Sequence, residues 1–151
     1  MVSIRNATLK DEVKVFELLK ILFSNAAPGE RVDDWSAMAK EFRRITKDEA
    51  KGNVIVAEEN GVILGLVTVS YIEAIRCAGI YGSIEEFVVS EAARGKGVGG
   101  RLLEAVVEKA TKKGCTDIIV NRPSQLGYPV YLRNGFNDAG KNLMMKLPRI
   151  S

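Results

Sequence analysis

The residues best suited to chemistry in this chain form a glycine-rich segment, Arg94-Gly95-Lys96-Gly97-Val98-Gly99-Gly100, between an expected strand and an expected helix. Glycine lets the backbone turn tightly and lets amide N–H groups approach a ligand with no Cβ in the way. A helix N-terminus adds unpaired N–H groups and about half a positive charge. The arginine and lysine side chains add two cations. The segment therefore predicts a binding site for a pyrophosphate.

Two other interpretations of this segment remain open. One is a flexible connection with no ligand. The other is a dinucleotide fold, because Gly95, Gly97 and Gly100 satisfy the pattern G-x-G-x-x-G. Residues 90–94 separate the strand from the first glycine, however, whereas a dinucleotide fold places that glycine directly after the strand. A Walker A motif is absent, since no Gly-Lys-Ser/Thr follows a glycine at the required spacing.

Two acidic residues, Glu85 and Glu86, lie inside an otherwise apolar strand, and Tyr131 follows in the C-terminal part. A carboxylate can take a proton from an ammonium group, and a tyrosine hydroxyl can protonate a leaving group. Neighbouring residues of a strand point to opposite faces, so only one glutamate should line a cleft unless a bulge intervenes. Each of these catalytic roles has an alternative. One glutamate could face solvent while the other pairs with an arginine, and Tyr131 could be only a core aromatic.

Several kinds of site are excluded by composition. The chain has no histidine, which excludes Ser-His and Cys-His nucleophilic pairs and His-ligated catalytic metals. Cys77 and Cys115 lack C-x-x-C spacing, so we expect no metal site. Two isolated cysteines are typical of free thiols in a reducing compartment, so we expect the protein in the cytoplasm. No apolar run approaches the ~20 residues of a membrane span. No block of about five basic residues predicts a nucleic-acid partner.

The charge is unevenly distributed along the chain. Residues 1–89 carry 11 Lys/Arg and 14 Asp/Glu, whereas residues 90–151 carry 11 Lys/Arg and 5 Asp/Glu. A basic C-terminal part suits a phosphate-bearing ligand, although a solvated basic face is an equally good interpretation of the charge alone.

The elements that must position these residues follow from hydrophobic periodicity. A chain of 151 residues has room for one domain, residues 1–151. We expect strands at residues 2–7, 54–57, 62–69, 80–89, 117–121 and 143–147, and helices at 9–24, from about 35 to 45, at 98–113 and at 128–134. Asn60-Gly61 predicts a hairpin turn, and Gly114 a helix C-cap. The order β-α-α-β-β-β-α-β-α-β predicts an α/β fold with one mixed sheet and helices on both faces.

Three motifs resemble those of the GNAT superfamily, a family of acyl-CoA-dependent N-acetyltransferases. Arg94, Gly97 and Gly99 match its signature R/Q-x-x-G-x-G/A, residues 84–89 are similar to its fourth strand, and Tyr131 followed by Gly135-Phe136 is similar to its tyrosine segment. The expected order of elements agrees with the GNAT fold along nearly the whole chain. The resemblance thus implies a GNAT-like N-acetyltransferase with acetyl-CoA as co-substrate and no metal.

The resemblance also implies which residues bind the coenzyme. Loop amides from Gly95 to Gly100, with the neighbouring side chains, would bind the pyrophosphate; this set is Arg94, Gly95, Lys96, Gly97, Val98, Gly99 and Gly100. Backbone groups of Phe87, Val88 and Val89 would pair with the pantetheine arm. The family often has an asparagine seven residues before the tyrosine. Ser124 holds that position here, while Asn121 lies ten residues before Tyr131, and either could bind the coenzyme.

For the chemistry, the resemblance implies a glutamate base acting through water and a tyrosine acid. It favours Glu85 over Glu86 as the base and gives Tyr131 the role of acid. The acceptor would be a small-molecule or peptide amine, and homodimers are common in the family. A non-catalytic acyl-CoA-binding domain is the first alternative, and a dinucleotide-binding oxidoreductase is the second.

Overall fold

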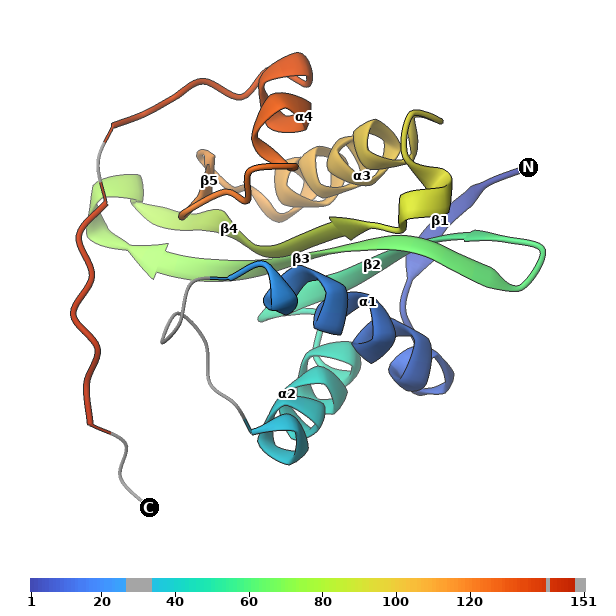
Figure 1. Cartoon of the computed structure of the whole chain (residues 1–151). Coiled ribbons are helices and arrows are strands. Elements are labelled where there is room, and N and C mark those ends of the chain that lie inside the picture. Colours follow the sequence, from blue (N-terminus) through green and yellow to red (C-terminus); the bar gives the residue numbers. More distant parts are fainter. Residues whose placement is uncertain (27–33, 141, 149–151) are drawn as a thin grey trace.

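A computed structural model of the chain describes residues 1–26, 34–140 and 142–148. Its centre is a five-stranded sheet in the order β1-β2-β3-β4-β5, in which all neighbours are antiparallel except β4 and β5 (Figure 1). The strands are β1 (Ser3–Asn6), β2 (Gly52–Glu59), β3 (Val62–Ala74), β4 (Gly79–Val89) and β5 (Ile118–Val120). The mixed sheet predicted from the sequence is confirmed.

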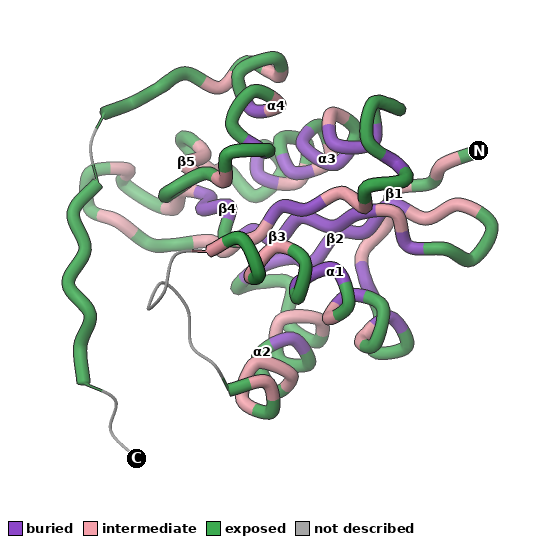
Figure 2. Tube along the Cα trace, in the orientation of Figure 1, coloured by how far each residue is buried: buried purple, intermediate pink, exposed green. Residues whose placement is uncertain are grey.

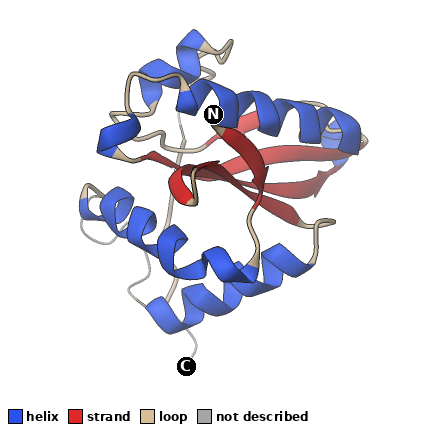
Figure 3. Cartoon of the chain, turned by 90° about the vertical axis from the view of Figure 1, so that its right-hand side faces the viewer, coloured by secondary structure: helices blue, strands red, loops and turns tan. Residues whose placement is uncertain are grey.

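Helices cover both faces of this sheet. On one face lie α1 (Glu12–Ser24) and α2 (Trp35–Lys47), and on the other lie α3 (Val98–Lys113) and the short α4 (Tyr128–Arg133) (Figure 3). Two clusters of buried apolar side chains result, one on each side of the sheet, and Figure 2 shows the buried positions along its central strands. The predicted α/β architecture is therefore confirmed. No helix in the described residues is both long and apolar enough to cross a membrane.

Local sequence signals account for most of these elements. Buried Leu102, Leu103 and Val106 of α3 recur at helical spacing and face the sheet, and the helix ends at Gly114 with φ 85°. Between β2 and β3, Asn60 (φ 51°) and Gly61 (φ 77°) both adopt positive φ, as the predicted two-residue hairpin turn requires.

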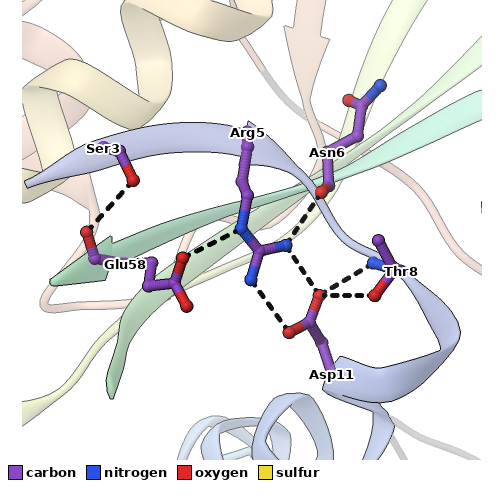
Figure 4. Close-up of polar contacts among 6 residues, drawn as sticks. All are labelled: Ser3, Arg5, Asn6, Thr8, Asp11 and Glu58. Carbon is purple, nitrogen blue, oxygen red and sulfur yellow. Dashed lines mark hydrogen bonds and ion pairs between the residues drawn. The ribbon is translucent and has the colours of Figure 1, made fainter. Parts of the chain in front are cut away.

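A partly buried ion pair attaches β1 to the start of α1 (Figure 4). Arg5 donates two hydrogen bonds to the Asp11 carboxylate, at 2.8 and 3.0 Å, and a third to Glu58 on β2 at 3.1 Å. Asp11 also accepts a hydrogen bond from the backbone N–H of Thr8 at 2.8 Å. The bonds from Arg5, opposed by burial, hold the pKa of Asp11 below its ordinary value.

The prediction of a last strand at residues 143–147 is wrong. Residues 142–148 form neither helix nor strand, and Leu143 is 99% exposed. A strand needs a partner for its backbone groups, and this segment pairs with no strand of the described sheet. Its apolar residues, Leu143, Met144 and Met145, are also consecutive and so do not alternate as a half-buried strand would. The element order in the described residues is therefore β-α-α-β-β-β-α-β-α.

Candidate active site

Strand β4 contains a bulge at the two glutamates. Val67 of β3 pairs with Phe87 and Val69 pairs with Ile84, so Glu85 and Glu86 together stand opposite Thr68. This extra residue on one strand is what defines a β-bulge. The expectation that only one glutamate lines a site held for a regular strand, and the bulge removes that restriction.

Both carboxylates accept hydrogen bonds from hydroxyl groups on the α1–α2 face of the sheet. Thr68 donates to Glu86 and Ser83 donates to Glu85, each at 2.5 Å. Val67, Val69 and Ile84 pack in the cluster on the α3 side, so the alternation of strand side chains directs Thr68 and Ser83 to the opposite face. The bulge thus brings the two carboxylates to one face.

The two glutamates differ in environment. Glu85 is exposed, whereas Glu86 is half-buried. Burial raises the pKa of Glu86 above its ordinary value; the hydrogen bond from Thr68 opposes this rise, and the charge of Glu85 adds to it. A carboxyl group with a raised pKa is closer to the range in which it can exchange protons near neutral pH.

Tyr131 lies on α4, close enough to Glu86 for an electrostatic interaction. The tyrosine is only 5% exposed, and its ring lies between Phe87 (5.1 Å between centroids) and Phe136 (5.3 Å). Burial, followed by the negative charge of Glu86, raises the pKa of the Tyr131 hydroxyl. The hydroxyl therefore stays protonated at neutral pH, as a proton donor must. The packing also fits the alternative role of Tyr131 as a core aromatic.

One edge of β4 is free beyond the bulge. The parallel pairing with β5 covers only Gly82, Ser83 and Ile84, so Glu85 to Val89 have no strand partner on that side in the described sheet. On the other side, Phe87, Val88 and Val89 pair with β3. Their side chains are wholly or partly buried, so their backbone groups are what this edge offers to a ligand. An extended ligand with amide groups could complete the ladder here.

The glycine segment follows β4 and leads into α3. Gly95 (φ 79°) and Gly97 (φ 78°) adopt left-handed conformations that other residues rarely take, and Gly97 is the N-cap of α3. The first α-helical bond runs from the N–H of Arg101 to the carbonyl of Gly97 at 3.2 Å, so the preceding amides of the first turn lack helical partners. The segment therefore forms a helix N-terminus whose first amides lack helical partners, a geometry that favours an anionic ligand.

Side chains divide this segment into exposed and buried parts. Arg94 and Lys96 are exposed, whereas the Val98 side chain is 2% exposed and belongs to the core, so only its amide could contact a ligand. A Cβ added to Gly99 would lie 3.2 Å from Phe87, and one added to Gly100 would lie 3.2 Å from Asn134. These two glycines allow α3 to approach its neighbours closely.

Asn121 and Ser124 lie between β5 and α4. Asn121 is exposed and directly follows β5, near the point where pairing with β4 has ended. Ser124 is half-buried, and its hydroxyl accepts a hydrogen bond from the amide of Gly127 at 3.0 Å, just before α4. The Ser124 hydroxyl thus accepts the bond of a turn and can still donate its own proton, while the Asn121 side chain is the more exposed of the two.

Sequence reasoning missed two residues of this site, Thr68 and Ser83. Their hydroxyls were not singled out because threonine and serine are common in strands. The register of β3 against β4 places Thr68 beside Glu86, whereas Ser83 lies two residues before Glu85 on β4 and shares its face. No cluster of His, Cys, Asp or Glu able to hold a metal ion occurs among the described residues.

A mixed sheet with helices on both faces and a glycine loop at a helix N-terminus are the features that the resemblance to the GNAT superfamily implied. The chain belongs to the Acetyltransferase (GNAT) family, whose profile matches residues 13–136. The prediction of an acetyl-CoA-dependent N-acetyltransferase is thus confirmed at the level of the family.

Two plant relatives are similar in sequence to this chain, one over about half of it and the other over most of it. Glucosamine 6-phosphate N-acetyltransferase 1 of Oryza sativa subsp. japonica is 40% identical over 74 residues, which are 48% of this chain and 42% of that protein. The probable glucosamine 6-phosphate N-acetyltransferase 2 of the same plant is 28% identical over 144 residues, 92% of this chain and 84% of that protein.

Solved structures show the same fold. The structure of glucosamine-6-phosphate N-acetyltransferase from Arabidopsis thaliana matches with a TM-score of 0.78 at 24% identity, over 98% of this chain and 99% of that one. A predicted acetyltransferase with acetyl-CoA from Clostridium acetobutylicum matches with a TM-score of 0.80 at 22% identity, over 97% and 96% of the two chains.

Proposed function

We propose that this chain transfers the acetyl group of acetyl-CoA to a primary amine of a small molecule or peptide. The observation that carries the proposal is the free edge of β4, with the glycine loop at one end and Glu86 and Tyr131 beside it. Pantetheine amides would pair with this edge, while the pyrophosphate would bind the amides at the start of α3. The thioester would then lie near the two acid–base residues.

The reaction in this proposal is a direct attack of the amine on the thioester. Glu86, acting through a water molecule, takes a proton from the ammonium group, whose pKa is ordinarily ~10. The neutral nitrogen bonds to the carbonyl carbon, the carbon–sulfur bond breaks, and the sulfur takes the proton of the Tyr131 hydroxyl. The proton that the nitrogen releases restores the tyrosine, and Glu86 gives up its proton through the water to solvent. A β4 amide donates to the carbonyl oxygen as its negative charge develops.

Glu86 is proposed as the base in preference to Glu85, which the family resemblance favoured. Its support is the environment of each carboxylate: Glu86 is half-buried, has a raised pKa and interacts with Tyr131, whereas Glu85 is exposed. A base with a raised pKa binds its proton more strongly at the pH where the amine must lose one.

Glucosamine 6-phosphate is the first acceptor to test, because the rice relatives carry that substrate in their names. The stronger of these matches covers less than half of its relative, so the acceptor is part of the proposal. The panel should also contain an aminoglycoside, a polyamine and a peptide with a free N-terminus. The measurement is release of free thiol from acetyl-CoA, with acetylated product identified by mass spectrometry.

The expected result is thiol release that depends on one class of amine and that falls in the Tyr131→Phe variant. Tight binding of acetyl-CoA with no thiol release for any amine would support the acyl-CoA-binding alternative. Absence of acetyl-CoA binding would refute the proposal.

A further inference from the structure

Thr68 makes two hydrogen bonds to a single residue, Glu86. Its hydroxyl accepts from the backbone N–H of Glu86 at 3.0 Å and donates to the Oε1 atom of the same residue at 2.5 Å. A hydroxyl group has one proton to donate and lone pairs to accept, so it can make both bonds at once. Thr68 is only 8% exposed, which keeps water from competing for either bond.

The bulge explains why such a contact is needed. Glu85 and Glu86 share one opposite residue, so the ladder between β3 and β4 is interrupted at this point. The N–H of Glu86 is satisfied by the Thr68 hydroxyl, a side-chain acceptor, rather than by a carbonyl of the ladder. Threonine is also β-branched, which restricts χ1 and keeps the hydroxyl in one place. The same group thus holds both the main chain and the side chain of Glu86.

We propose that Thr68 is a positioning residue that orients the Glu86 carboxylate for proton transfer. The inference rests on the proposed function, in which Glu86 is the base. The bond from Thr68 occupies Oε1, while Oε2 accepts no hydrogen bond from any described residue and is the oxygen that receives the proton. Ser83 makes the equivalent contact with Glu85, so each carboxylate has its own hydroxyl.

The inference predicts a direction for the pH dependence. A hydrogen bond donated to a carboxylate favours its charged form, and the bond from Thr68 lowers the pKa of Glu86 against the effects of burial and Glu85. The other titratable group that interacts with Glu86 in the described part of the chain is Tyr131, which stays neutral. Loss of the Thr68 hydroxyl therefore raises the pKa of Glu86 further and moves the acidic limb of the rate profile to higher pH.

The test uses the pH profile of kcat/KM for thiol release in the full chain. Thr68→Val removes the hydroxyl at nearly constant shape. We expect its acidic limb to move up by about one pH unit, which is about a tenfold loss of kcat/KM on that limb, with acetyl-CoA affinity unchanged. Thr68→Ser keeps the hydroxyl and should restore the position of the limb. Ser83→Ala, the matched control, removes the hydroxyl contact of Glu85 and should leave the limb in place.

Each outcome decides the matter. If the limb of Thr68→Val stays in place, or if Thr68→Ser shifts it as much as valine does, the inference is overturned. A shift in Ser83→Ala alone overturns it in favour of Glu85. Should Thr68→Val fail to fold, Thr68→Ala takes its place because it also removes the hydroxyl: its acidic limb should move up by the same amount, and an unmoved limb overturns the inference. Failure of the proposed function would look different, because the unsubstituted protein would then release no thiol with any amine.

Discussion

Replacement of Tyr131 by phenylalanine separates its chemical role from its structural one. The ring lies between Phe87 and Phe136, and phenylalanine keeps both contacts. The hydroxyl donates no hydrogen bond to any residue in the described part of the chain, so its removal leaves no acceptor there without a donor. We expect the free energy of unfolding to change by less than about 1 kcal/mol.

The expected loss of activity is far larger. Protonation of a leaving group by a positioned side chain contributes about 10²- to 10⁴-fold, which is about 2.7–5.4 kcal/mol of the activation free energy. Burial and the charge of Glu86 raise the pKa of Tyr131 above its ordinary value, so the hydroxyl is protonated throughout the neutral range. The ratio of kcat between the original protein and Tyr131→Phe should therefore be constant between about pH 6 and pH 9.

The assay is thiol release at saturating acetyl-CoA, together with calorimetric titration of acetyl-CoA and thermal unfolding. Tyr128→Phe is the matched control: Tyr128 lies on the same helix, is 37% exposed, and donates its hydroxyl to Asp138 at 3.1 Å, away from the buried ring cluster. Activity should be retained in this control. Full activity of Tyr131→Phe would refute the role of acid and leave Tyr131 as a core aromatic.

Three further predictions concern the base, the glycine loop and the ion pair. Glu86→Gln should lower kcat/KM by about 10²- to 10⁴-fold and remove the acidic limb of the pH profile, whereas Glu85→Gln should keep the limb; the reverse result would exchange the two roles. Gly97→Ala should destabilise the fold by about 1–2 kcal/mol in denaturant unfolding because its φ is 78°, and should also weaken acetyl-CoA binding. Gly114→Ala, at the other end of α3 with φ 85°, should cost similar stability and leave binding unchanged; equal binding in both variants would argue against the loop as the coenzyme site. Asp11→Asn should lower stability by about 2 kcal/mol at pH 7. Because the pKa of Asp11 is depressed in the fold, this contribution is present above its ordinary pKa of ~3.9 and is lost as the pH falls through the lower folded value. Urea unfolding should show that the free energies of unfolding of the original protein and Asp11→Asn differ near neutral pH and become equal at low pH. A difference that does not change with pH would contradict this role of the Asp11 carboxylate.

Features that depend on nearby residues were predictable from the sequence. The spacing of Leu102, Leu103 and Val106 specifies a helix because residues three and four apart share one face. Asn60-Gly61 specifies a tight turn because both residues tolerate positive φ. The glycine loop was recognisable for the same reason, since its conformations and its position before a helix are local properties.

The prediction of the last strand failed because strand formation does not depend on local sequence alone. Residues 143–147 are mostly apolar, which suggested a strand, but a strand exists only where another chain segment offers unpaired backbone groups in register. Composition alone cannot show whether such a partner is available, and residues 142–148 are exposed in the structure.

The sequence by itself determined the family, the glycine loop at the start of α3 and the identity of the acid–base candidates, because each depends on residue types at short spacing. Only the tertiary structure decided how the environments of Glu85 and Glu86 differ and that Glu86 meets the hydroxyl of Thr68. The Thr68–Glu86 contact depends on the register between β3 and β4, and the bulge changes that register by one residue. A shift of one residue turns a strand's side chains to the other face, and pairing across 18 residues of chain has no signature in either strand alone.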